Sequence, residues 1–193
     1  MRLARVAAGA LVGVAVLAGC SSGPAPANDT LPSAAPTSAE ASETLTPLGP
    51  PDFPMPPEAR EQTPAGAEAF LRYYLSLVNH QAGKDGQALR DLSRDCAFCD
   101  FIADRYDQDA ASGYTYRGGA ISIDSLSAPA MNGDLAEFSL TLSQAPVDIL
   151  APDGAAVAGR GEGQRSGLNA GASMTWSLTT SSWLMNQLIV NEQ

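Results

Sequence analysis

The pattern of apolar and polar residues divides the chain into three stretches. Residues 6–17 form an unbroken run of apolar and small residues. The next stretch, as far as residue 62, has few apolar residues and holds ten of the 14 prolines. From residue 63 onward, apolar residues recur first at helical spacing and later at every second position. We therefore expect one folded domain over residues 63–193, preceded by two segments that lack a core of their own.

The first part of the domain has the signals of a long amphipathic helix. Thr63 is a suitable N-cap, Pro64 suits the first helical position, and Gly83 is typical of a helix end. Between these signals the apolar residues fall on one face of a helix. They are Phe70, Leu71, Tyr74, Leu75 and Val78.

Two further helices are expected before residue 114. A short one follows Asp85 and contains Leu89 and Leu92. The next is predicted to begin at Asp95 and to end at Gly113, because its apolar residues are spaced four apart. These residues are Phe98, Ile102 and Tyr106.

After Gly113 the apolar period becomes two, which predicts strands with one apolar and one hydroxyl-bearing face. Such strands belong to an antiparallel sheet that is covered on one side. Trp183–Val190 is predicted as the last strand, after the polar turn formed by residues 180–182. The inward positions that the alternation predicts are Ile121, Ile123, Ala136, Phe138, Leu140, Leu142, Ala172, Met174, Trp176 and Leu178. The fold class is thus α+β, with three N-terminal helices covering four or five antiparallel strands.

The amino terminus has the pattern of a lipoprotein signal peptide. Arg2 and Arg5 precede the apolar run, which is too short to span a bilayer. Residues 17–20 read Leu-Ala-Gly-Cys and resemble the lipobox of bacterial lipoproteins, which implies cleavage after residue 19 and lipidation of Cys20. Two or more acyl chains, palmitate among them, would anchor the protein stably. We expect it on the outer face of the bacterial cytoplasmic membrane, with residues 20–62 as a disordered linker.

Charge bears on the class of partner. The formal net charge is -10, and the chain contains a single lysine, Lys84. Binding to nucleic acid requires clustered lysine and arginine residues. We therefore expect no nucleic-acid partner, and the membrane contact is predicted to run through the lipid on Cys20.

Cys96 and Cys99 are the pair of residues with the richest chemistry in the domain. Two cysteines at this spacing can form a disulfide, act as a redox pair, remain free thiols or bind a metal. Outside the membrane a disulfide persists, which favours that interpretation. A metal would need further ligands, and His80 is the only histidine. We expect a structural disulfide and no metal or other cofactor.

Three other features carry weaker signals. Asp100, Asp104, Asp107 and Asp109 lack the order of an EF-hand loop and are interpreted as an acidic helix face. His80 is interpreted as a solvated residue near the end of the first helix. Residues 152–167 are rich in glycine, contain Arg160 and Arg165, and match no phosphate-binding motif. They are predicted to form a long loop, with contact to a partner as the alternative.

Two resemblances follow from these elements. The run from Met174 to Val190, with Trp176 and Trp183 on either side of a tight turn, resembles the end of the nuclear-transport-factor-two-like superfamily, which includes ketosteroid isomerases. The lipobox, the spacer, residues 66–70 (Gly-Ala-Glu-Ala-Phe) and the Cys-x-x-Cys pair look like a family of uncharacterised actinobacterial lipoproteins. The resemblance covers residues 63–193 and implies a cone in which helices fill the concave face of a bent sheet.

The resemblance leaves two functional hypotheses. One is a non-enzymatic binding or accessory domain for a small apolar ligand or a cell-envelope protein. The other is a pocket enzyme of the ketosteroid-isomerase type that uses acid/base chemistry on a small hydrophobic substrate. Polar residues that such a cone could place in its pocket are Tyr74, Tyr106, Tyr114, Tyr116 and Asp124. Since they form no recognisable constellation, no catalytic residue is assigned and the first hypothesis is favoured.

Overall fold

The computed structural model describes residues 45–191. The expected signal peptide (1–19), the lipidated Cys20 and the linker as far as residue 44 lie outside the described residues. In chain order the elements are η1 (Pro57–Arg60), α1 (Pro64–Gln81), α2 (Gln87–Asp91), α3 (Ala97–Ala111), β1 (Thr115–Gly118), β2 (Ile121–Leu126), β3 (Ala130–Asn132), β4 (Leu135–Gln144), β5 (Val147–Leu150), β6 (Arg165–Ser177) and β7 (Ser182–Asn191).

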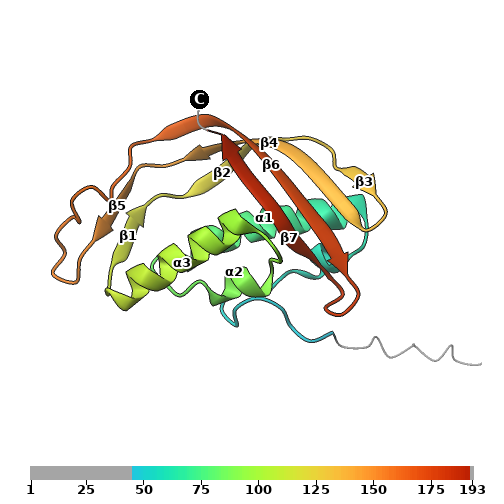
Figure 1. Cartoon of the computed structure of the whole chain (residues 1–193), viewed down its shortest axis with the longest axis horizontal. Helices are drawn as coiled ribbons and strands as arrows, with labels where there is room; N and C mark the ends of the chain where they lie inside the picture. The colour runs from blue at the N-terminus through green and yellow to red at the C-terminus, as the bar shows by residue number, and fades with distance from the viewer. Residues whose placement is uncertain (1–44, 192–193) are drawn as a thin grey trace, which may run out of the picture. The chain divides into compact units, whose positions relative to one another are not determined.

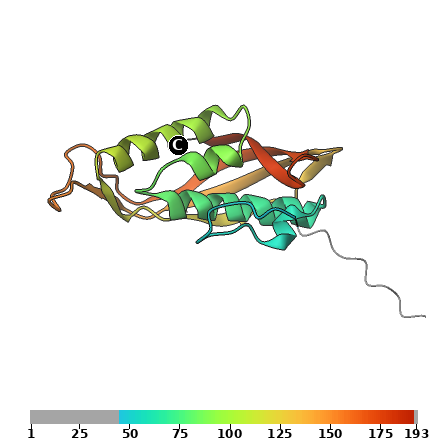
Figure 2. The same ribbon diagram turned by 90° about the horizontal axis from the view of Figure 1, so that it is seen from below.

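The strands form a five-stranded antiparallel sheet and a separate two-stranded ribbon. The sheet has the order β2-β4-β6-β7, with β3 also paired to β4. The ribbon consists of β1 and β5 and lies at the opposite end of the fold from β3 (Figure 1). The three helices pack on one side of the sheet, which curves over them (Figures 1 and 2). The predicted α+β fold, with three helices on the concave side of a bent antiparallel sheet, is confirmed.

Irregularities in strand pairing explain the bend of the sheet. The register shifts between Ile123 and Ser125 on β2, between Leu142 and Gln144 on β4, and between Ser173 and Met174 on β6. A bulge bends its strand and increases the local twist. With three such sites, the sheet can wrap around the helices and stay hydrogen-bonded.

The core lies between the helices and the concave face of the sheet. Phe70, Tyr74 and Leu77 of α1 are fully buried, as are Met174 of β6 and Trp183 of β7. On β4 the predicted inward residues, at positions 136, 138, 140 and 142, are all buried. The alternation that the sequence shows on this strand therefore corresponds to its core face.

The ends of α1 agree with the sequence, whereas α3 begins later than expected. The Thr63 hydroxyl accepts a hydrogen bond from the Gly66 amide, and Gly83 has the positive φ typical of a residue that follows a helix. The predicted start of α3 at Asp95 is wrong by two residues. Asp95 has a φ of 55°, outside the helical range, and Cys96 is the N-cap.

Leu178 does not lie on the core face, so the prediction for this residue is wrong. Its side chain is 83% exposed, because β6 ends at Ser177 and the chain turns there toward β7. Periodicity alone extended the strand by one residue into the turn. Trp176, two residues earlier, packs edge-on against Trp183 with ring centroids 5.4 Å apart.

The folded domain begins before Thr63, which corrects the expected boundary. Leu48, Phe53, Met55 and Ala59 pack against the core, and the last two are buried. This leading segment (residues 48–62) lies along α1 (Figure 2). The Arg60 guanidinium fixes its end by donating to carbonyl oxygens of residues 46, 180 and 181. Residues 48–62 therefore belong to the domain rather than to a disordered linker.

None of the helices between residues 45 and 191 is both long enough and apolar enough to span a membrane.

Candidate functional site

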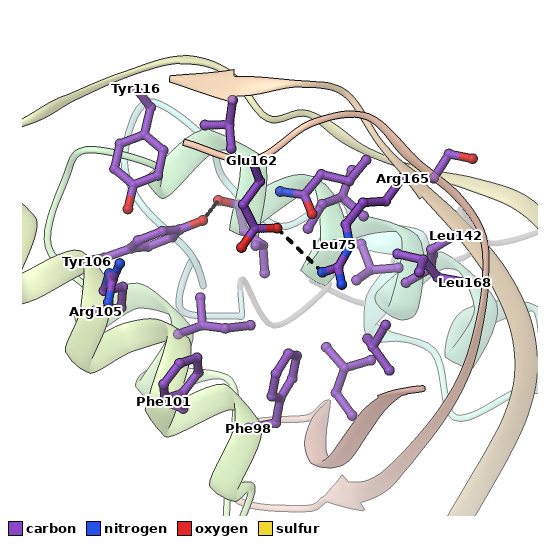
Figure 3. Close-up of a pocket in the computed structure, with 18 of the residues that line it drawn as sticks. Leu75, Phe98, Phe101, Arg105, Tyr106, Tyr116, Leu142, Glu162, Arg165 and Leu168 are labelled. Carbon is purple, nitrogen blue, oxygen red and sulfur yellow. Dashed lines mark hydrogen bonds and ion pairs between the residues drawn. The ribbon is translucent and has the colours of Figure 1, made fainter. Parts of the chain in front are cut away.

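A pocket of about 490 Å³ lies between α3 and the concave side of the sheet (Figure 3). This volume is in the range of sites for small molecules. Most of its lining is aliphatic or aromatic. The lining residues are Leu75, Val78, Phe98, Phe101, Ile102, Arg105, Tyr106, Tyr116, Ile121, Leu142, Ser143, Gln144, Val147, Ile149, Arg160, Glu162, Arg165, Leu168, Leu188 and Val190.

The helical wall of the pocket comes mainly from one face of α3, with Leu75 and Val78 added by α1. Residues three and four apart share a helix face, so Phe98, Phe101, Ile102 and Arg105 all reach the pocket. The Phe98 and Phe101 rings stack with centroids 6.1 Å apart. They are 37% and 61% exposed, respectively, although phenylalanine is usually buried. α3 therefore presents an exposed aromatic rim to the pocket.

The sheet wall of the pocket is part of the same concave face of the sheet that forms the core. Leu142 of β4, Leu168 of β6 and Val190 of β7 point inward at the positions that the strand alternation gives them. In Figure 3, Leu142 and Leu168 lie at one end of the pocket, and Arg105, Tyr106 and Tyr116 lie at the other. One end of the pocket is thus polar, and the ion pair of Glu162 and Arg165 lies between it and the two leucines.

Two tyrosines supply hydroxyl groups at the polar end. Burial raises the pKa of Tyr106 to about 12, and its hydroxyl donates to the Val78 carbonyl oxygen at 3.1 Å. The pKa of Tyr116 is also raised, first by burial and then by its hydrogen bond to the Asp109 carboxylate. Both phenols therefore remain protonated at neutral pH.

Asp109 lies next to the polar end of the pocket and holds Tyr116 and Arg160 in place. Its side chain is 1% exposed, and its two oxygens accept from Arg160 Nη2 at 2.6 and 2.8 Å. The Tyr116 hydroxyl donates to Oδ2 at 2.5 Å, and Arg105 Nε lies 3.7 Å from the same oxygen. A buried carboxylate requires such partners. The interpretation of Asp109 as part of an exposed acidic face is therefore wrong.

Cations gather at this pocket in a chain that has few. Arg105, Arg160 and Arg165, three of the 11 lysine and arginine residues, are among its lining residues. Among residues 45–191, Glu162 is the single carboxylate in the lining, and it forms an ion pair with Arg165 at 3.4 Å. Because one Glu and the buried Asp109 face three arginines, the surroundings of the pocket carry a positive excess.

Cys96 and Cys99 lie at the start of α3. Their sulfur atoms are 1.96 Å apart, at disulfide distance, and both residues are 1% exposed. Reactive cysteines are typically accessible, so this burial favours the structural interpretation over the redox one. The pair fixes the first turn of the helix that carries Phe98 and Phe101.

The structure separates the five polar candidates that the sequence offers for a pocket. Tyr106 and Tyr116 line it. Tyr74 is fully buried in the core, and burial raises its pKa. Asp124 is exposed on β2 and accepts from the Ser143 hydroxyl. The Arg160 guanidinium lies over the Tyr114 ring, with its Cζ 5.9 Å from the ring centroid. No acid/base constellation forms from these residues within the described chain.

His80 and the glycine-rich loop differ from their predicted settings. His80 stacks on Phe53 of the leading segment, lies 3.1 Å from Asp52 Oδ2 and is 25% exposed, so it is half-buried rather than fully solvated. Residues 165–167 of the expected loop belong to β6. The rest of the loop is held to β5 by main-chain hydrogen bonds such as those between Val147 and Glu162, and to α3 by Arg160, which bonds to Asp109. That link between loop and helix is not visible in any local sequence pattern.

No protein-family model matches the chain, and no curated protein matches it in sequence. Ten chains of solved structures match. One of them is a variant of a designed protein titled Rd1NTF2_05, with 13% identity and a TM-score of 0.40 over 65% of this chain and 96% of that chain.

Proposed function

We propose that this chain is a membrane-tethered bacterial lipoprotein whose domain binds a small apolar ligand in the pocket between α3 and the sheet, without catalysis. The observation that supports this most strongly is an open pocket of about 490 Å³ with a mainly apolar lining. Burying apolar ligand surface there stabilises a complex by roughly 25 cal/mol per Å². A cell-envelope protein fits less well, because the apolar side chains line a hollow rather than a flat patch.

Catalysis of the ketosteroid-isomerase type is the weaker alternative. A general base must reach the proton that it removes. The two carboxylates near the pocket are both engaged by arginine, Asp109 with Arg160 and Glu162 with Arg165. Asp109, moreover, is absent from the pocket lining. This arrangement supports a binding site, since both carboxylates already have cationic partners.

The proposal predicts that the full chain binds a neutral apolar fluorophore, N-phenyl-1-naphthylamine, and that filling the pocket prevents this. In Leu168→Trp the larger ring enters the cavity from β6, and the affinity is expected to fall at least tenfold, since about 1.4 kcal/mol of lost contact suffices. The measurement is a fluorescence titration of the purified protein.

Ile189→Trp is the matched control for the pocket variant. Ile189 is 43% exposed and lies between two inward residues of β7, so its side chain points to the opposite face. This variant is expected to bind the fluorophore as the parent protein does. Equal affinity in Leu168→Trp and the parent, or equal loss in both variants, would contradict binding in this pocket.

The proposed tether rests on the lipobox and Cys20, which lie outside the described residues. Replacing Cys20 with serine removes the thiol that would carry the lipid, and is expected to abolish incorporation of a labelled fatty acid in the bacterial host. The variant should also leave the membrane fraction. Undiminished labelling in Cys20→Ser would overturn the tether and leave the proposal for the pocket intact.

A further inference from the structure

The pocket shows a polarity that the proposed binding function does not require. One end is formed by aliphatic residues such as Leu142 and Leu168, and the other by Arg105, Tyr106 and Tyr116 (Figure 3). A purely apolar ligand would leave the charged end without a partner. The lining therefore fits a molecule with an apolar chain and one polar end.

Arg105 is the residue best placed to meet that polar end. Its side chain is 41% exposed, lines the pocket, and forms no hydrogen bond with any of residues 45–191. Its one ion pair is the contact of 3.7 Å from Nε to Asp109. A guanidinium carries five donors in a planar fork that matches an acid headgroup. Arg105 thus has donors available at the rim of the pocket.

Arg160 adds a second positive charge at the same end. Its Nη2 is held by Asp109, while its Nε is buried and has no acceptor in the described part of the chain. Because Nε is buried, Arg160 contributes charge to this end of the pocket rather than a donor that a ligand reaches directly. Glu162 does not reverse the sign of the site, because Arg165 pairs with it.

We infer that the ligand is an amphipathic acid of the fatty-acid class, whose carboxylate binds Arg105 near Arg160 and whose alkyl chain extends toward Leu142 and Leu168. This inference rests on the proposed binding function. It adds the chemistry of the headgroup and the direction in which the ligand lies. A long-chain ammonium ion would be repelled, because its positive headgroup would lie beside the net positive charge of the arginines.

The test compares probes that differ only at the headgroup: decanoate, decan-1-ol and decylammonium, each titrated calorimetrically into the full chain. An ion pair with the guanidinium, which the neutral decanol cannot form, predicts about tenfold tighter binding of decanoate. Decylammonium is expected to bind most weakly. Added salt should weaken the binding of decanoate and leave that of decanol unchanged.

The variant Arg105→Gln tests the assigned residue. It should reduce the affinity for decanoate about tenfold and change that for decanol far less, because the glutamine amide can still donate to a hydroxyl but forms no ion pair. Arg117→Gln is the control, since Arg117 is exposed on β1 and pairs with Asp148 outside the pocket. Circular dichroism spectra of both variants should match that of the parent.

The outcomes separate the two proposals. If decanol and decanoate bind with equal affinity and Arg105→Gln changes neither, the pocket binds apolar chains but the inferred headgroup recognition is wrong. If none of these probes binds while N-phenyl-1-naphthylamine does, the inference fails and the proposed binding function stands; if the fluorophore does not bind either, both fail. If Arg105→Gln loses affinity for decanoate selectively and Arg117→Gln does not, the result supports both the binding function and the inferred headgroup recognition.

Discussion

Replacing Asp109 with alanine is expected to lower the free energy of unfolding by about 3 kcal/mol. Removing one partner of a buried ion pair typically costs 3–5 kcal/mol, and the lower end applies because the Arg160 side chain is 23% exposed. The Tyr116 hydroxyl loses its acceptor as well. Urea denaturation of the full chain, followed by circular dichroism, measures the change.

Asp104→Ala provides the comparison on the same helix. Asp104 also bonds to an arginine, Arg90, at 2.6 Å, but its side chain is 64% exposed. Exposed ion pairs contribute between about 0 and 1 kcal/mol, so this variant should unfold close to the parent. Equal destabilisation of the two variants would show that the Asp109 cluster is not the stabilising feature described above.

Trp183→Ala is expected to be the most destabilising single substitution on β7, at about 4 kcal/mol. The Trp183 side chain is fully buried, packs edge-on against Trp176, and donates its indole N–H to the Glu61 carbonyl oxygen at 2.9 Å. Alanine leaves a cavity and removes the contact between β7 and the leading segment. Denaturant titration again gives the size of the effect.

Leu178→Ala serves as the control for this prediction. Leu178 has the apolar character of a core residue but is 83% exposed in the turn after β6. Its replacement should change the free energy of unfolding by less than about 0.5 kcal/mol. A loss similar to that of Trp183→Ala would mean that the turn is packed differently from the structure described above.

The fold was largely predictable because its periodic signals are strong. The cap at Thr63, the glycine at 83 and the strict alternation along residues 136–142 report local geometry directly. The ribbon of β1 and β5 was not expected. β1 is mostly exposed and shows little alternation, and β5 alternates between buried and exposed positions over only four residues, which is too short a signal. Pairing between distant short strands is decided by the tertiary structure.

The predicted start of the folded domain, after residue 62, was misplaced because the prediction relied on the proline-rich composition of the stretch and not on its individual apolar residues. The prolines of this stretch indicate a spacer, yet Phe53 and Met55 lie among them and pack against α1 and the core. One aromatic and one aliphatic side chain close to a helix start are a detectable signal. Whether such residues pack depends on the surface that the rest of the chain offers.

The pocket was the least predictable feature. Phe98 appeared in the helical pattern as a core residue, whereas it is 37% exposed at the rim. Arg105 and Arg160 are 55 positions apart and meet only because the loop before β6 returns to α3. Asp109 joins them, and its burial follows from that tertiary contact. A single sequence contains no periodic signal for such a cluster.

The location of the bound ligand tests the account most directly. In an isotope-filtered NMR experiment on the full chain with bound N-phenyl-1-naphthylamine, we predict intermolecular NOEs to the methyl groups of Leu142 and Leu168, which line the pocket. NOEs confined to Met131 and Ile189, exposed apolar residues outside the pocket lining, would contradict it.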